Sequence, residues 1–263
     1  MNILKIILIV FLLVLCTACK NTNYGACEPA EEIPKLTDKA EHGDTEAACR
    51  LRWHYEYCEE DNKQASYWLH KGASYGDVHA QFDLSCILLD KYVSHSDKDI
   101  TEGIELLKKT AEQNYNLAQT ILGDYFKEGK YVTQDWKQCE YWYRRAAKDG
   151  DTTGMQKLSD LLLLKKKTLP GLSESYKWAT IIAYRSKPGS YHYQSAKQQQ
   201  QAVIDEAEKI NINIALLKLK AENQAKNENS KIPQNIFSAP TCSDKYTKIP
   251  NKPIHADPRS AGR

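Results

Sequence analysis

The sequence has 263 residues, with 36 lysines and arginines against 34 aspartates and glutamates, and a formal net charge of +2. This near-neutral balance disfavours a nucleic-acid-binding protein, because phosphate backbones are bound by clearly cationic surfaces. The length is sufficient to bury an adequate core in one elongated domain.

Residues 1–18 have the layout of a bacterial export signal. Lys5 is followed by an apolar run, and the small residues Thr17 and Ala18 close the segment. The run is too short to span a membrane as a stable helix. We therefore predict a signal peptide over residues 1–18 and export of the remaining chain.

Cys19 follows the predicted cleavage site directly, and this arrangement resembles the lipobox of bacterial lipoproteins. In those proteins the cysteine is acylated after cleavage; here Cys16 replaces the leucine that the lipobox prefers. An ordinary signal peptidase would cut after the same Ala18, so acylation and simple secretion both stay open. Lys20 is not the aspartate that retains such lipoproteins at the inner membrane. The resemblance therefore implies a lipid anchor at Cys19 in the outer membrane, on its periplasmic side.

Residues 19–32 combine Asn, Gly, Pro and Glu without helical periodicity, which predicts a tether. Beyond Cys19 the mature chain has six cysteines, an even number in an oxidising compartment, and this favours disulfides. The disulfide candidates are Cys27, Cys49, Cys58, Cys86, Cys139 and Cys242.

The stretch from Ala118 to Gly150 predicts a helical hairpin. Apolar residues recur at helical spacing up to Phe126, Gly129 breaks the run, and a second apolar run ends at Gly150. The same columns recur once downstream, about 36 residues on, and twice upstream with small changes in the turn. The four units are anchored at Ala47, Ala80, Ala118 and Gly154.

One such hairpin cannot bury its apolar stripe alone, so this period predicts stacked repeats. Small residues at the repeat columns let helices approach closely, and a glycine at the end of the unit can adopt the left-handed conformation that ends a helix. We predict an all-α fold over residues 33–186, a right-handed α-solenoid of about four helix-turn-helix repeats with terminal capping helices.

The unit at residues 117–150 resembles the Sel-one-like (Sel1-like) repeat, a relative of the tetratricopeptide repeat. The residues that stand where the family has them are Leu122, Gly123, Gly129, Val132, Asp135, Trp142, Tyr143, Ala146 and Ala147. The other units lack the turn glycine and replace Gly123 by Arg52, Ser85 and Ser159. The resemblance covers about residues 33–186 and implies a fold that binds other proteins, although such repeats bind many unrelated partners.

The remaining sequence predicts a cap and a tail. A turn at residues 187–191 precedes two predicted helices, at about 193–209 and 212–226, so residues 187–230 are assigned to capping helices. Residues 231–263 hold five of the nine prolines and no helical period. We expect this tail to be extended or disordered.

Helix geometry limits the cysteine pairings. Cys49 and Cys58 lie on opposite faces of one predicted helix and cannot bond to each other. Cys49 and Cys86 lie on the first helices of adjacent units, about one turn apart in height, and are a candidate pair; Cys27–Cys58 is a second suggestion. A Cys/His metal site around His54 is the competing interpretation, but the spacing matches no zinc pattern, and we predict no metal and no cofactor.

One catalytic motif is present in the sequence. Residues 72–76, Gly-Ala-Ser-Tyr-Gly, satisfy the G-x-S-x-G pattern of the lipase and esterase nucleophile elbow. That elbow needs a strand before Ser74, whereas residues 62–73 are the predicted second helix of the first unit. We therefore predict no catalytic residue and no enzyme activity.

Trp68, Trp142 and Trp178 share one repeat column and are predicted core residues. The tetratricopeptide resemblance implies that certain first-helix positions face a concave binding surface. Acidic residues outnumber basic ones at these positions, which favours a basic partner, with Trp53 and Tyr57 as aromatic anchors. A solvated face with Trp53 packed against a neighbour is the alternative. The predicted partner-binding residues are Glu46, Trp53, Glu56, Tyr57, Asp90, Asp124, Glu128 and Asp160.

Export, a predicted protein-binding groove and the lack of a catalytic motif in a suitable context together predict a periplasm-facing protein binder. Proteins that resemble this one, small exported lipoproteins with Sel1-like repeats, include immunity proteins that neutralise toxic effectors of type VI secretion, often phospholipases. The resemblance implies a toxic effector as the partner. An envelope scaffold or regulatory adaptor for endogenous proteins is the alternative, and a β-lactamase-like hydrolase, a role ascribed to cysteine-rich relatives, is the third interpretation.

Overall fold

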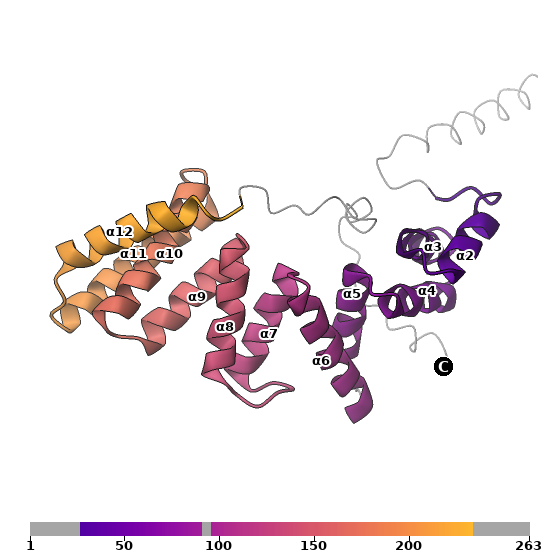
Figure 1. Cartoon of the computed structure of the whole chain (residues 1–263), viewed down its shortest axis with the longest axis horizontal. Helices are drawn as coiled ribbons and strands as arrows, with labels where there is room; N and C mark the ends of the chain where they lie inside the picture. Colours follow the sequence, from indigo (N-terminus) through magenta and orange to yellow (C-terminus); the bar gives the residue numbers. More distant parts are fainter. Residues whose placement is uncertain (1–26, 91–95, 234–263) are drawn as a thin grey trace, which may run out of the picture. The chain divides into compact units, whose positions relative to one another are not determined.

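A computed structural model describes residues 27–90 and 96–233 (Figure 1). These residues form eleven helices and no strand, which confirms the predicted all-α fold. The predicted signal peptide, Cys19, most of the tether, Cys242 and residues 234–263 of the predicted tail lie outside the described residues.

The helices pair as the repeat pattern predicts. Helix α3 contacts α4, α5 contacts α6, α7 contacts α8 and α9 contacts α10, so all four predicted hairpins are present. The helices are α2 (Ile33–Glu41), α3 (Thr45–Tyr57), α4 (Asn62–Ser74), α5 (Val78–Leu88), α6 (Asp97–Glu112), α7 (Asn116–Glu128), α8 (Trp136–Lys148), α9 (Thr152–Lys165), α10 (Leu169–Arg185), α11 (Tyr191–Lys209) and α12 (Ile214–Asn229).

The chain divides into two compact units between Tyr75 and Gly76, inside the predicted solenoid. Among the described residues, the first unit holds one hairpin, α3 and α4, with α2 as a preceding half-repeat. The second unit holds three hairpins followed by α11 and α12. In the second unit α6 contacts α7, α8 contacts α9 and α10 contacts α11, so successive hairpins stack directly.

At three junctions between helices, a glycine follows the end of one helix and the next residue, an aspartate, caps the start of the following helix. The junctions are Gly43-Asp44, Gly76-Asp77 and Gly150-Asp151. The three glycines have φ angles of +95°, +92° and +94°, a conformation in which a side chain would be strained. Each aspartate carboxylate accepts a hydrogen bond from the backbone N–H three residues on, which belongs to the anchor residue of the following repeat. Before α7, Asn114 takes the glycine position with a φ of +65°.

The core of the first unit lies between its three helices. Leu36 and Ala40 of α2 pack with Leu51 of α3 and Trp68 of α4. A disulfide between Cys27 and Cys58 ties the segment before α2 to the residue that ends α3. In the same region the Arg50 guanidinium donates to both carboxylate oxygens of Glu28, at 2.7 and 2.6 Å.

The disulfide corrects the cysteine predictions. The suggested Cys27–Cys58 pair is confirmed, whereas the candidate pair Cys49–Cys86 is wrong, because both residues are free thiols. Cys139 is a free thiol as well. Cys86 packs against the apolar cluster of α5 to α8, and burial raises the pKa of its thiol to about 12. Cys139 is fully buried, so these two cysteines of the second unit act as small apolar core residues.

The second unit buries three apolar clusters. Trp142 lies with Leu122 in the cluster of α5 to α8, and Trp178 lies with Met155 in a cluster built mainly from α8, α9 and α10. The third cluster joins α10, α11 and α12 and includes Leu217. Trp68, Trp142 and Trp178 are 3%, 6% and 0% exposed, which confirms the prediction that their column belongs to the core.

The two C-terminal helices cap the stack much as predicted. Ser190 closes the preceding turn by donating its backbone N–H to the Lys187 carbonyl oxygen at 3.0 Å, and its side chain caps α11. Helix α12 packs mainly against α10 rather than against α11. The last element of the unit therefore covers the second helix of the final hairpin.

Candidate protein-interaction surface

Helices α5, α7 and α9 lead the three hairpins of the second unit and carry the predicted surface positions there. Some of these positions are buried between hairpins: the Phe82 ring lies 4.9 Å from the ring centroid of Tyr115, and the Tyr131 hydroxyl donates to the Leu89 carbonyl at 3.1 Å. The positions that remain exposed are Leu117, Lys127, Glu128, Thr153, Asp160 and Leu164. The accessible part of the predicted surface therefore belongs to α7 and α9, and we call these six residues the first-helix face.

Asp124 forms hydrogen bonds and an ion pair within the fold. Its carboxylate accepts a hydrogen bond from the Tyr143 hydroxyl of α8 at 2.5 Å and lies 2.8 and 2.9 Å from the Lys157 ammonium of α9. Burial, together with this bond, raises the pKa of the Tyr143 hydroxyl. Asp124 therefore joins the two helices of its own hairpin to the next one, and its charge is compensated before a partner arrives.

The other predicted carboxylates of the second unit differ in exposure. Asp90 is half-buried just beyond α5, whereas Glu128 is exposed in the last turn of α7. Asp160 is exposed on α9 and accepts a hydrogen bond from the Gln156 amide at 3.0 Å. Lys127 stands beside Glu128, so the first-helix face carries both signs of charge. The preference for a basic partner thus depends mainly on Glu128 and Asp160.

In the first unit, the predicted aromatic anchors form a pair on α3. The rings of Trp53 and Tyr57 have centroids 4.1 Å apart, and both residues are half-buried. Glu56 lies 3.4 Å from Arg52 in an ion pair one turn apart, while Glu46 is exposed in the first turn of the helix. This pair offers a partly accessible aromatic surface, and its assignment to partner binding stays a prediction.

Within the described residues, neither the esterase-like serine motif nor the Cys/His metal site has the geometry that its chemistry needs. Ser74 is the last residue of α4, and its hydroxyl donates to the Lys71 carbonyl at 2.7 Å, so it stands at a helix end and not on a strand-to-helix elbow. Cys58 is engaged with Cys27 and is unavailable to a metal near His54. Over residues 27–90 and 96–233, no group of three or more His, Cys, Asp or Glu side chains could hold a metal ion.

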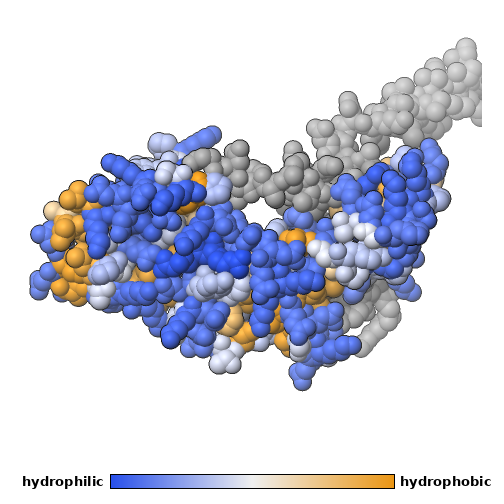
Figure 2. All heavy atoms as spheres, in the orientation of Figure 1, coloured by the Kyte–Doolittle hydropathy of each residue, from blue (hydrophilic) through white to orange (hydrophobic). Residues whose placement is uncertain are grey.

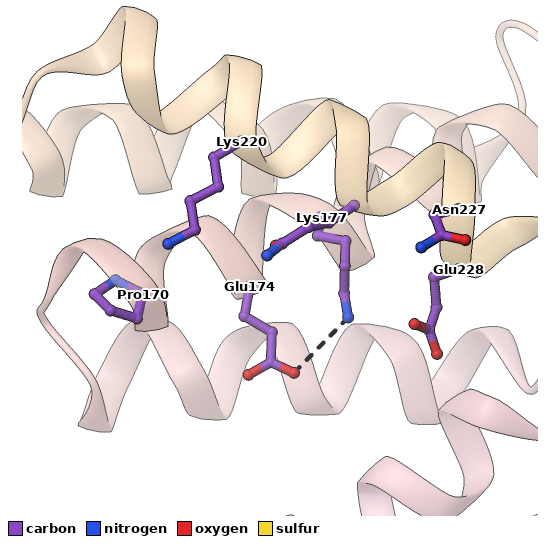
Figure 3. Close-up of a pocket in the computed structure, with 7 residues that line it drawn as sticks. Pro170, Glu174, Lys177, Lys220, Asn227 and Glu228 are labelled. Carbon is purple, nitrogen blue, oxygen red and sulfur yellow. Dashed lines mark ion pairs between the residues drawn. The ribbon is translucent and has the colours of Figure 1, made fainter.

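A polar pocket of about 340 Å³ lies between α10 and α12 (Figure 3). Lys177 is buried there, with its ammonium 3.8 Å from Glu174 and 4.2 Å from the centroid of the Trp178 ring. Burial lowers the pKa of Lys177, while Glu174 is held by the Arg144 guanidinium. The lining residues are Pro170, Glu174, Lys177, Lys220, Gln224, Asn227 and Glu228. Two lysines face two glutamates, so the net charge of the lining selects neither an anion nor a cation.

Sequence reasoning missed this pocket and the role of Asp124. The signal for the pocket was Lys177, a lone lysine in the apolar run of α10. Asp124 gave no comparable signal, because Tyr143 and Lys157, which bind it, lie on two later helices.

Stacked hairpins, glycine-aspartate junctions and exposed first-helix positions define an α-solenoid repeat protein. The Sel1 repeat family model matches three segments of the chain, residues 55–77, 78–115 and 116–151. Residues 55–151 of the chain are therefore Sel1-like repeats. Sel1 repeats mediate protein–protein interaction, so the repeats suggest a protein as the kind of partner.

One relative and two solved structures are similar to this chain, and the first of the two structures supports the fold. The uncharacterized protein YibG of Escherichia coli K12 is 26% identical over 136 residues, which are 52% of this chain and 66% of that protein. The crystal structure of a protective antigen from uropathogenic Escherichia coli, which displays an SLR fold, has a TM-score of 0.58 at 21% identity, covering 79% of this chain and 42% of the antigen. A Sel1 repeat protein from Oxalobacter formigenes has a TM-score of 0.44 at 26% identity, covering 49% of this chain and 98% of its own.

Proposed function

We propose that this protein binds and neutralises another protein in the bacterial envelope, as an immunity protein against a toxic effector of type VI secretion. The observation that carries the binding role is the first-helix face, where exposed apolar and charged side chains stand on a stack of buried helices. A rigid surface of this kind loses little conformational freedom when it binds. The choice of a toxic effector, including a phospholipase, rests on the resemblance to exported Sel1-like immunity proteins.

The proposed location follows from the predicted signal peptide and the predicted lipid anchor at Cys19. It places the binding surface in the periplasm, where an incoming effector would be met. The test is detergent partitioning of the wild type and of Cys19→Ser expressed in a Gram-negative host. Transfer of the variant from the detergent phase to the soluble phase supports acylation, and unchanged partitioning contradicts it.

The binding role is tested with an effector encoded beside this chain, produced in the periplasm with and without it. We expect the chain to restore growth and to bind the effector with a Kd of about 1 nM or tighter, about −12 kcal/mol. If no adjacent effector is rendered harmless, the immunity role fails and an adaptor for endogenous proteins takes its place.

Charge reversal tests which surface is used. Glu128→Lys combined with Asp160→Lys removes both exposed carboxylates of the first-helix face, and we expect the effector to bind at least about tenfold more weakly. Glu102→Lys combined with Glu105→Lys is the matched control, because both residues are exposed on α6, the second helix of its hairpin. Equal weakening by the two double variants would contradict the use of the first-helix face.

A further inference from the structure

Two loops lie together at one end of the second unit. The first joins α9 to α10 and the second joins α11 to α12. The Lys167 ammonium of the first loop lies 2.7 Å from Glu206 near the end of α11. Leu163 and Leu169, on either side of the first loop, pack against the same cluster as Ile212 of the second. The two loops and the helix ends beside them therefore form one surface.

This surface is both apolar and basic. Residues 164–169 and 209–220 contain six lysines and no aspartate or glutamate, and Glu206, which pairs with Lys167 and Lys209, is the carboxylate beside them. We call this surface the basic apolar end. Its large exposed apolar residues are Leu164, Ile210, Leu216 and Leu219, at 57%, 38%, 50% and 60% exposure. Figure 2 shows hydrophobic residues gathered where α11 meets α12.

The first turns of α12 separate buried and exposed side chains. Leu217 and Ala221 are fully buried in the cluster with α10 and α11. Leu216 and Leu219 lie one turn apart on another face and point outward together, while the exposed Lys220 beside them also lines the pocket between α10 and α12. The end of a repeat stack normally presents a polar outer face, because polar capping keeps the protein soluble. Exposed leucines at this position indicate that something covers them.

Charge decides between the candidate occupants. A second copy docked end to end would bring two lysine-rich surfaces together, which is unfavourable. Residues 234–263 carry five basic residues and two acidic ones, so this segment has the same sign of charge as the surface. A stable protein interface uses about 20 to 30 residues a side and is depleted in lysine at its core, whereas this end has 18 residues, six of which are lysines. An anionic surface into which apolar groups insert shallowly fits both the positive charge and the small size of the basic apolar end.

We infer that the basic apolar end binds the surface of an anionic phospholipid membrane. The exposed leucines and Ile210 enter the headgroup boundary, and the lysines reach the phosphates with their ammonium groups while their stems cover apolar surface. No helix within residues 27–90 and 96–233 is long and apolar enough to cross a membrane, so this contact is with the membrane surface. The inference is independent of the proposed effector, and the basic apolar end shares only Leu164 with the first-helix face.

Vesicle co-sedimentation tests this contact directly. The probe is phosphatidylcholine vesicles with about 30% phosphatidylglycerol, compared with phosphatidylcholine alone. The protein is the full mature chain with Cys19→Ser, so that no acyl chain contributes. We expect binding to the anionic vesicles only, and weaker binding when salt rises from about 0.1 M to about 1 M. Absence of binding to the anionic vesicles would overturn the inference.

Variants locate the contact. Leu216→Asn with Leu219→Asn should abolish vesicle binding, and Lys218→Gln or Lys220→Gln should each weaken it about fivefold. Leu117→Asn is the matched control, because Leu117 is also 50% exposed but lies on α7, and it should bind vesicles like the wild type. Equal loss in this control would overturn the assignment to the basic apolar end.

The alternative occupant and the proposed function have separate readouts. A wild-type dimer in sedimentation equilibrium that the Leu216→Asn, Leu219→Asn variant dissociates would make this end a self-interface and refute the inference. Effector binding should be unchanged in the same double variant. Failure of vesicle binding therefore leaves the immunity test intact, and failure of the immunity test leaves the vesicle result intact.

Discussion

The two units contain the same hairpin but are stabilised by different means. The first unit, with three described helices, has a small apolar cluster, a disulfide from Cys27 to Cys58 and an ion pair between Arg50 and Glu28. The second unit has three clusters, two of which hold more buried residues than the cluster of the first unit. Its described cysteines, Cys86 and Cys139, are free thiols packed with apolar side chains. Small units bury proportionately less surface on folding, so a covalent cross-link contributes more to them. The repeat pattern determines the hairpin, while the size of the unit determines whether a disulfide is needed to stabilise it.

Removing the largest core side chain of the second unit should have the greatest effect. Trp178 is fully buried, so Trp178→Ala should lower the free energy of unfolding by about 3–5 kcal/mol. Hydrogen exchange in α9 and α10 measures the loss. Tyr184→Ala on the same helix removes a side chain that is 53% exposed and should change stability by less than about 0.5 kcal/mol. Similar losses in both variants would show that the cluster around Trp178 does not dominate the unit.

The disulfide should matter next, and in the first unit alone. Cys27→Ser with Cys58→Ser removes a cross-link between residues 31 apart in sequence and should cost about 2–4 kcal/mol. Exchange protection should fall in α2, α3 and α4 and stay unchanged in α8, α9 and α10. Cys49→Ser, which replaces a free thiol on α3, is the control. Equal losses in the second unit would remove the difference between the two units.

The third and fourth hairpins have the same fold but pack different side chains between their two helices. In the third, Gly123 lies against the Tyr143 ring, and a Cβ atom at Gly123 would come within 2.5 Å of that ring. In the fourth, the matching columns hold Ser159 and Ala179, and the Ser159 hydroxyl donates to the Ser175 carbonyl at 2.8 Å. A small residue therefore faces a large ring in the third hairpin, whereas two serines, Ser159 and Ser175, are hydrogen-bonded to each other in the fourth.

Gly123→Ala tests whether the Tyr143 ring requires a glycine at position 123. Overpacking against Tyr143 should cost about 1–3 kcal/mol, which outweighs the gain of about 1 kcal/mol in helix propensity. In a Tyr143→Ala background the clash is gone, so the same substitution should become stabilising. Chemical denaturation of the four members of this double-mutant cycle measures the change of sign. The same destabilisation in both backgrounds would show that the tyrosine ring is not what requires glycine.

Periodic features were predictable from sequence, and features made by distant side chains were not. The hairpins and the buried Trp142 column follow from helical spacing of apolar residues, a local property. Asp124 occupies a column typical of a surface, and its engagement arises only when Tyr143 and Lys157 are brought to it by folding. The Cys49–Cys86 prediction failed because helical register alone does not show that the Cys86 side chain packs into a core.

The smallest expected effect concerns an ion cluster that joins the third and fourth hairpins, and it depends on pH. Arg144 of α8 pairs with Glu140 on its own helix and with Glu174 of α10. Burial alone would raise the pKa of Glu174, but the Arg144 guanidinium overcomes this and holds it below its usual value. The folded pKa is then lower than the unfolded one. The pair therefore contributes stability above the unfolded pKa, and this contribution is lost as pH falls through the folded pKa.

Because Glu174 is partly exposed, the contribution should be at most about 1 kcal/mol. Glu174→Gln should lower stability at neutral pH by about that amount and should make the second unit less sensitive to acid, since no carboxylate remains there to be protonated. Unfolding free energies of the wild type and the variant should therefore converge as pH falls below about 4. Glu105→Gln, at an exposed position of α6, is the control and should leave the acid dependence unchanged. If the difference between wild type and Glu174→Gln were the same at neutral and acid pH, the cluster would stabilise the hairpins through packing and not through charge.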